Sequence, residues 1–179
     1  MDSIKNIIGG GIITIFVGGA AFSFSQQDVV DNFASDTGMT QEQAEQYVNA
    51  IPEEELATWT EIGTDYVTES GKTLVMANEI DCVNYEYEWE SPTLTCSQGK
   101  AQLQKIANTE KSLGQSYIKL DSDTAVAEDM RTTISFLDML DSDYEHEIST
   151  TVFDTKVLDE IKTTNSYNKS LLKAALESN

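Results

Sequence analysis

Residues 103–120 read LQKIANTEKSLGQSYIKL, and apolar side chains recur in this stretch at a spacing close to three, four and seven residues. The apolar row consists of Leu103, Ile106, Leu113, Tyr117 and Leu120. Only Glu110 interrupts the row, which falls on one side of an α-helix. Such a stripe is typical of a helix that packs one face against other helices. The stretch therefore predicts a long amphipathic helix.

Three further windows repeat this spacing, at residues 52–80, 126–148 and 158–175. The first contains Leu56, Trp59, Gly63, Tyr66, Ser70, Leu74 and Ala77, and the second contains Val126, Met130, Thr133, Leu137, Leu140, Tyr144 and Ile148. Pro52 and the three glutamates after it are typical of a helix start, whereas residues 163–166 (TTNS) are expected to interrupt the last helix. Long amphipathic helices joined by short turns predict a mainly α fold, an up-and-down helical bundle.

Two local signals lie between the N-terminal segment and residue 52. Residues 35–38 (SDTG) are expected to end a helix, because glycine favours the position after a helix terminus. Thr40 and Gln43 have the spacing of a capping box, in which each side chain bonds the backbone of the other residue. We therefore expect a short helix to begin after Thr40.

The N-terminus carries an uncharged apolar segment. No charged side chain occurs from Asn6 to Gln27, and residues 7–24 read IIGGGIITIFVGGAAFSF. As an α-helix this segment would span about 27 Å, close to the hydrocarbon thickness of a bilayer. We expect residues 4–25 to form a transmembrane helix and residues 1–27 to act as a membrane anchor or signal segment.

A cleaved signal peptide is the alternative interpretation of the same segment. Ser23 and Ser25 supply the small residues that signal peptidases favour, with cleavage before Gln26. Lys5 flanks the segment on one side, and the next basic residue is Lys72. The positive-inside rule then predicts a cytoplasmic N-terminus and an exported domain, residues 28–179.

The chain has two cysteines, Cys82 and Cys96. In an oxidising compartment, two cysteines at this separation favour a disulfide, which closes a short loop and stabilises the fold by about 3 kcal/mol. A CxxC redox motif or a zinc site does not fit their spacing, and the chain has only one histidine. The sequence therefore predicts a structural disulfide.

The segment between the cysteines alternates with a period of two residues. Tyr85, Tyr87 and Trp89 share one face and glutamates share the other, which predicts a small β-hairpin over residues 82–96. Two roles for the aromatic row remain open. It could be a partner-binding stripe, since tyrosine and tryptophan dominate binding hot spots, or it could pack across the end of the bundle.

The charge is strongly acidic and uneven. The chain has 31 acidic and 11 basic residues, a net charge of −20, which argues against nucleic acid as a partner. Residues 28–96 contain 16 acidic residues and 1 basic residue, so this half carries −15 of the total. A solvated acidic surface, adaptation to high salt and a partner with a basic face are all compatible with this composition.

No motif points to catalysis, a cofactor or a metal. The densest polar cluster comprises Asp141, Asp143, Glu145, His146 and Glu147. On one helix these side chains point in several directions, and the cluster lacks the glycine of an EF-hand loop, so we predict no metal site. A nucleophile elbow and a phosphate-binding glycine loop are not found either, and we expect no cofactor and no enzymatic activity.

The best-supported expectation is a non-enzymatic, membrane-anchored or exported protein that acts through protein contacts or self-association. It could be a subunit of an envelope, surface or virion assembly. The alternative is a small-ligand-sensing ectodomain that signals through a partner, because helical bundles can hold ligands between their helices.

Overall fold

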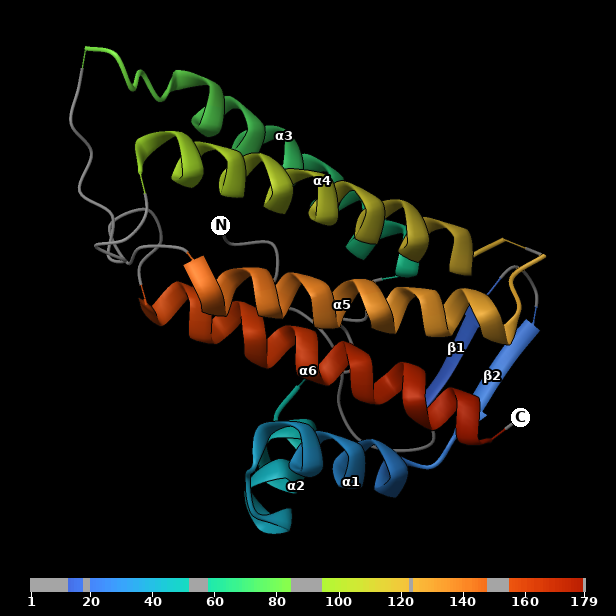
Figure 1. Ribbon diagram of the computed structural model, residues 1–179. Helices are drawn as coiled ribbons and strands as arrows, with labels where there is room; N and C mark the ends of the chain where they lie inside the picture. The colour runs from blue at the N-terminus through green and yellow to red at the C-terminus, as the bar shows by residue number, and fades with distance from the viewer. Residues whose placement is uncertain are drawn as a thin grey trace.

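Six helices account for most of the described part of the chain. The computed structural model describes residues 13–17, 20–51, 58–84, 95–122, 124–147 and 155–178. The helices are α1 (Gln26–Thr37), α2 (Gln41–Asn49), α3 (Trp59–Glu79), α4 (Cys96–Leu120), α5 (Ala127–Glu147) and α6 (Thr155–Glu177). Two strands, β1 (Ile13–Val17) and β2 (Ala20–Phe24), precede them (Figure 1). The prediction of a mainly helical fold is confirmed.

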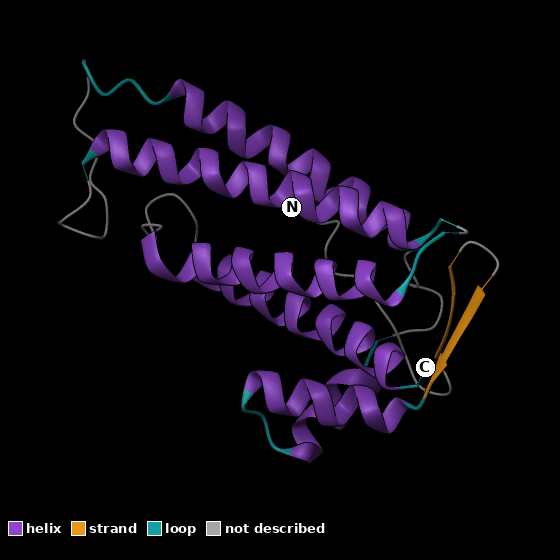
Figure 2. Cartoon of the chain, turned by 45° about the vertical axis from the view of Figure 1, so that its right-hand side comes forward, coloured by secondary structure: helices purple, strands orange, loops and turns teal. Residues whose placement is uncertain are grey.

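The helices are arranged in antiparallel pairs. Figures 1 and 2 both show α3 beside α4 and α5 beside α6, with α1 and α2 on the outer side of α6. Side-chain bonds between Lys105 of α4 and Asp143 of α5, and between Asn165 of α6 and Asp141, join neighbouring helices that run in opposite directions. The bundle from α3 to α6 therefore has the predicted up-and-down order.

The α3–α4 pair is held together by small residues. Gly63 of α3 lies against Gly114 of α4, so closely that a side chain on either would meet the backbone of the other. Seven residues further along α3, the Ser70 hydroxyl donates to the carbonyl oxygen of Ala107 at 2.7 Å. These positions include the two small residues of the predicted stripe, which mark where the helix backbones approach most closely.

Aromatic rings fill the space between the layers. Tyr117 stacks on Trp59 and Tyr66, with ring centroids 5.4 and 5.8 Å apart. Phe33 of α1 stacks on Tyr47 at 4.9 Å, and its edge meets Tyr167 of α6 at 6.0 Å. The rings around Tyr117 pack α3 against α4, and the rings around Phe33 pack α1 and α2 against α6.

Side-chain caps set the helix starts. The predicted capping box of Thr40 and Gln43 is confirmed, and Gly38 ends α1 with a φ of 70°. A further capping box, formed by Thr58 and Glu61, starts α3 at Trp59. The expected start at Pro52 lies outside the described residues, and the described helix begins later because Thr58 supplies the cap.

The helix predicted over the apolar N-terminal segment is not found where the structure describes it. Residues 13–17 and 20–24 pair as antiparallel strands, with Val17 opposite Ala20. Branched and aromatic residues favour strands, and the Gly18–Gly19 sequence between them is typical of a tight hairpin connection. Across the described ranges, no helix is both long and apolar enough to cross a membrane.

Two expectations about the later helices also need correction. Residues 163–166 do not interrupt α6, and the hydroxyls of Thr163 and Thr164 donate to carbonyl oxygens one turn earlier, an arrangement compatible with a continuous helix. Val126 and Leu74 were expected on buried stripes, but both are exposed. Val126 precedes the first turn of α5, and Leu74 lies on the outer side of α3.

Candidate functional site

The predicted disulfide is confirmed. Cys82 follows the end of α3 and Cys96 is the first residue of α4, and their bonded sulfurs hold the two Cα atoms 5.6 Å apart. The bond therefore joins the two helices at the end where the chain leaves one and enters the other.

The predicted partner-binding residues Tyr85, Tyr87 and Trp89 lie outside the described residues, as does most of the predicted hairpin. The described chain beside this segment exposes apolar side chains. Val83 is 91% exposed, next to the disulfide. Three consecutive residues near the end of α3 are also exposed, namely Leu74, Val75 and Met76. Packing within the described bundle does not account for this apolar surface.

A row of hydrogen bonds crosses the centre of the bundle. The Tyr66 hydroxyl donates to Oδ1 of Asn165, and Nδ2 of Asn165 donates to Oδ1 of Asp141 at 2.7 Å. Tyr66 and Asn165 are buried, and Asp141 is half-buried. Because the three residues come from α3, α6 and α5, the bonds fix how these helices are rotated relative to one another.

Glu110 is a carboxyl group in the bundle interior, only 3% exposed. Its Oε1 accepts a hydrogen bond from the Tyr144 hydroxyl at 2.8 Å, whereas Oε2 is buried without a hydrogen bond of normal geometry from the described residues. Burial raises the pKa of Glu110 to about 7, although the hydroxyls of Tyr144 and Thr73 lower it. Protonated and ionised forms therefore coexist near neutral pH.

Further polar groups are buried beside the Tyr66–Asn165–Asp141 row. The Tyr117 hydroxyl lies there next to the side chain of Asn168, which is also buried. Burial raises the pKa of Tyr117, nearby Tyr66 and Asp141 raise it further, and the hydrogen bond with Asn168 lowers it. The interior behind Asp141 is thus polar.

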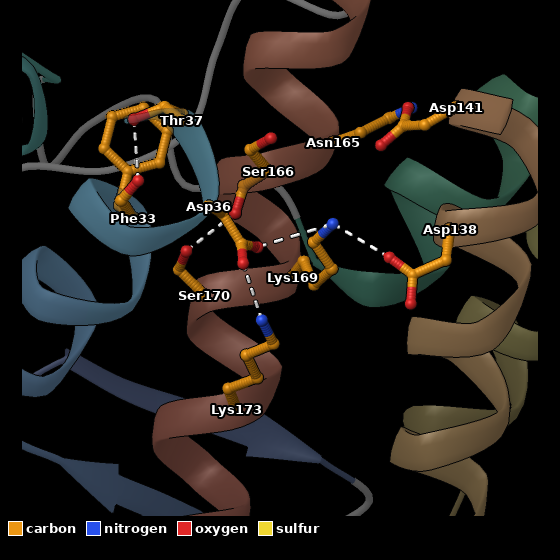
Figure 3. A network of polar contacts seen from close by, with 10 residues as sticks. All are labelled: Phe33, Asp36, Thr37, Asp138, Asp141, Asn165, Ser166, Lys169, Ser170 and Lys173. Carbon is orange, nitrogen blue, oxygen red and sulfur yellow. Dashed lines mark hydrogen bonds and ion pairs between the residues drawn. The ribbon is translucent and has the colours of Figure 1, made fainter. Parts of the chain in front are cut away.

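Asp141 also lines a pocket bounded by α5, α6 and the C-terminal end of α1. The pocket has a volume of about 480 Å³, within the range of small-molecule sites. Its lining is mostly polar, and consists of Asp36, Thr37, Met39, Asp138, Asp141, Ser142, Asp159, Lys162, Thr163, Ser166 and Lys169. Figure 3 shows how the side chains from these three helices meet.

Lys169 connects the two walls of the pocket. Its Nζ lies 2.9 Å from Oδ1 of Asp138 on α5 and 3.4 Å from Oδ2 of Asp36 on α1, and its side chain is only 12% exposed (Figure 3). Lys173, one turn further along α6, pairs with Oδ1 of Asp36 at 2.7 Å. Two lysines therefore compensate Asp36, and the network holds α1 and α5 against α6.

Asp141 is a carboxyl group with a raised pKa. Burial raises the pKa of Asp141 to about 6, although the hydrogen bond from Asn165 and the charges of Lys169 and Lys162 lower it. The neighbouring carboxylate of Asp138 raises the pKa further. A cation brought close to Asp141 would favour its ionised form.

The structure separates the acidic cluster at residues 141–147. Asp141 faces α6, whereas Asp143 faces α4, where the Lys105 ammonium lies 2.5 Å from its Oδ1. The side chains of residues 145–147 lie outside the described ones. Within the described ranges, no group of three His, Cys, Asp or Glu side chains could hold a metal ion.

Sequence reasoning missed the pocket, because its lining comes from three helices that are far apart in the chain. Each lining residue on its own is typical of the polar, solvent-exposed face of a helix. Glu110 did give a signal, as the one interruption of an apolar row.

Comparisons with protein-family models, curated proteins and solved structures find no match to this chain. Its function is therefore inferred from its own residues and their geometry.

Proposed function

We propose that the chain is an exported, non-enzymatic protein that acts through contacts with a protein partner, as a subunit of an envelope, surface or virion assembly. The Cys82–Cys96 disulfide supports export, because such bonds form and persist in oxidising compartments. The apolar, uncharged segment at residues 7–24 supports association with a membrane. Lys5 on its N-terminal side supports a cytoplasmic N-terminus, with the domain after residue 27 exported.

We expect Cys82 and Cys96 to be oxidised in protein taken directly from cells. Thiols are blocked with an alkylating reagent before lysis, and the intact mass is measured with and without reductant. The expected product is unalkylated and two hydrogens lighter than the reduced chain. Two alkylated cysteines would contradict export.

Retention of the chain in carbonate-washed membranes tests its association with a membrane. A mature N-terminus at Gln26 would show that the N-terminal segment is cleaved instead.

The observation that carries the protein-contact proposal is the exposed apolar surface near the disulfide end of α3. Val75 is 57% exposed, and it lies between two other exposed apolar residues, Leu74 and Met76. Three consecutive apolar side chains on the outside of a helix are unfavourable in water and typical of an interaction surface. The disulfide at this end of the α3–α4 pair keeps the surface in a fixed position.

The negative charge of the chain indicates which side chains its partner should carry. The half of the chain that contains α3 carries a net charge of −15. A partner with an apolar centre and a rim of basic side chains would match both features, because opposite charge around an apolar contact speeds association and selects against acidic surfaces.

We expect Val75→Asp to abolish co-purification of the partner while leaving the stability of the chain unchanged within about 0.5 kcal/mol. The matched control is Val126→Asp, because Val126 is 56% exposed and lies before α5. Tagged variants are isolated from the native membrane, and the recovered partner is quantified at equal melting temperature. Equal recovery with Val75→Asp and Val126→Asp would contradict the assignment of this surface.

A second candidate function is small-ligand sensing through a partner. The specific observation that favours it is the polar pocket of about 480 Å³ between α1, α5 and α6. A ligand in this pocket would contact three helices at once, and could change how α1 is held against the bundle. Retention of a small molecule by the purified chain would support this function independently of partner binding.

A further inference from the structure

Helix α4 carries a basic surface in a chain whose net charge is −20. The single acidic residue of this helix, Glu110, is buried in the bundle and only 3% exposed. The basic residues of the helix are Lys100, Lys105, Lys111 and Lys119. The outer side of α4 therefore offers positive charge without an exposed carboxylate of its own.

The ion pairs between α4 and α5 keep their lysines on the surface. The Lys105 side chain is 57% exposed, whereas that of its partner Asp143 is 7% exposed. Lys119 is 59% exposed, and its partner Asp129 is 10% exposed. Each pair therefore presents its positive end to a molecule that approaches along α4 and α5.

A groove of about 430 Å³ lies between α4 and α5 beside these lysines. Its apolar part comes from α5, where Phe136 is half-buried and Met139 is 46% exposed. Its polar part comes from α4 and includes Lys105, Asn108 and Ser112. An apolar centre with a polar and charged rim is typical of a protein-binding surface.

The exposed surface of α3 has the complementary pattern. Its apolar centre consists of Leu74, Val75 and Met76. The helix carries four acidic residues and one basic residue, Lys72. One of the acidic residues, Glu79, is exposed one turn after Val75. The partner that this surface requires has an apolar centre and a basic rim, and the α4–α5 groove of a second copy has both.

The two surfaces lie on different sides of one molecule. Figures 1 and 2 both place the C-terminal part of α3 on the side of α4 away from α5. A contact between unlike surfaces leaves one free surface at each end, so that further copies can add. In a two-fold dimer through α3 alone, the acidic residues of the two copies would instead face one another and repel.

We propose that the chain associates with itself head to tail, with the α3 surface of one copy seated in the α4–α5 groove of the next. This proposal rests on the proposed function, and it identifies the protein partner as a second copy of the chain. In the contact, Val75 packs against Phe136 and Met139, while the lysines of α4 face the acidic residues of α3.

The test combines two variants that each lose one of the two surfaces. Val75→Asp places a carboxylate in the apolar centre of the α3 surface, and Met139→Asp places one in the groove. Val126→Asp is the control, because Val126 is 56% exposed and does not line the groove, and the variant adds the same charge. The full chain with its disulfide intact is purified in a mild detergent, and sedimentation velocity measures its association over a series of concentrations.

We expect wild type and Val126→Asp to form dimers and larger species as the concentration rises. Each single-surface variant is expected to associate with itself about tenfold more weakly, or less. An equimolar mixture of Val75→Asp and Met139→Asp is expected to form a 1:1 dimer with the wild-type affinity and no larger species. The reason is that the intact groove of one variant and the intact α3 surface of the other still make one complete contact.

Circular dichroism and melting temperatures verify that each variant is folded, and Val75→Ser or Met139→Ser replaces a variant that is not. A mixture that associates no better than its folded components would overturn the head-to-tail contact. Wild-type chain that stays monomeric at every concentration would overturn self-association. Loss of a different co-purified protein in Val75→Asp would then still uphold the proposed function, so the two failures are distinguishable.

Discussion

Replacing Glu110 with glutamine is expected to raise the free energy of unfolding at pH 8 by about 3 kcal/mol and to remove most of its change between about pH 4.5 and pH 7. The carboxyl group is 3% exposed, and burial raises its pKa from 4.5 to about 7. Glu69, on the neighbouring helix α3, adds a smaller effect in the same direction, while the Tyr144 and Thr73 hydroxyls oppose it.

The direction of this pH dependence follows from which state binds the proton of Glu110 more tightly. The folded chain binds it more tightly, because the pKa of Glu110 is higher in the folded than in the unfolded chain. Stability from this group is therefore complete below about pH 4.5, where both states are protonated. It decreases as the pH rises through 7, because the folded state must then bury a carboxylate whose Oε2 has no hydrogen bond of normal geometry from the described residues. Glutamine has nearly the same shape, cannot ionise, and keeps an oxygen for the Tyr144 hydroxyl.

Urea unfolding of the two proteins from pH 5 to pH 8 measures this effect, with Glu128→Gln as the control for removing one negative charge. Glu128 is exposed, so its variant is expected to follow the wild-type profile within about 0.5 kcal/mol. Some slope will remain in Glu110→Gln, because burial also raises the pKa of Asp141, to about 6. Identical profiles for Glu110→Gln and wild type would show that the carboxylate is compensated in the folded chain.

The helices were predictable because the apolar spacing that identifies a helix in the sequence also places its apolar side chains on the face that packs against other helices. Leu103, Leu113 and Tyr117 are fully buried, as their spacing predicts. The boundaries were harder to predict where a side-chain cap competes with another signal. Pro52 and its glutamates suggested an early start for the third helix, whereas Thr58 and Glu61 form the cap of the described helix.

The N-terminal segment shows what a hydropathy argument leaves out. Counting apolar residues over residues 7–24 measures affinity for an apolar environment, and this is the same for a helix and for paired strands. Branched residues such as Ile13 and Ile15, with a glycine pair at 18–19, favour the strand pairing that the structure describes. The length and hydropathy of the segment therefore predict only its affinity for an apolar environment, whereas its branched residues and glycine pair predict its conformation.

The polar pocket could not be predicted, because it depends on how helices are rotated and not on where they occur. Asp36 and Lys169 are 133 positions apart, and no local spacing relates them. From the sequence, a lysine among polar and charged residues is expected to be exposed to solvent, yet the Lys169 side chain is nearly buried between two carboxylates. Only the packing of α1 and α5 on α6 brings these charges together.

The contact between Gly63 and Gly114 gives the other large expected effect. A Cβ atom added at Gly63 would lie 2.8 Å from Cγ1 of Ile118 and closer still to the carbonyl oxygen of Gly114. Backbone atoms cannot rotate aside as a side chain does, so α3 and α4 would have to separate along a shared surface that includes the Ser70–Ala107 hydrogen bond. Gly63→Ala is expected to lower the free energy of unfolding by about 3 kcal/mol or more, the upper end for an overpacked interior.

Gly71→Ala supplies a control in which the same chemical change has the opposite sign. Gly71 is exposed on the same helix, and an added Cβ atom there would meet nothing within 4 Å. Alanine restricts the unfolded chain more than glycine does, so this variant is expected to be more stable than wild type by about 0.5–1 kcal/mol. Urea unfolding of both variants with the disulfide intact measures the difference. A stabilised Gly63→Ala protein would show that the two helix backbones lie further apart in solution, and that the small residues of the α3 stripe are not what holds α3 against α4.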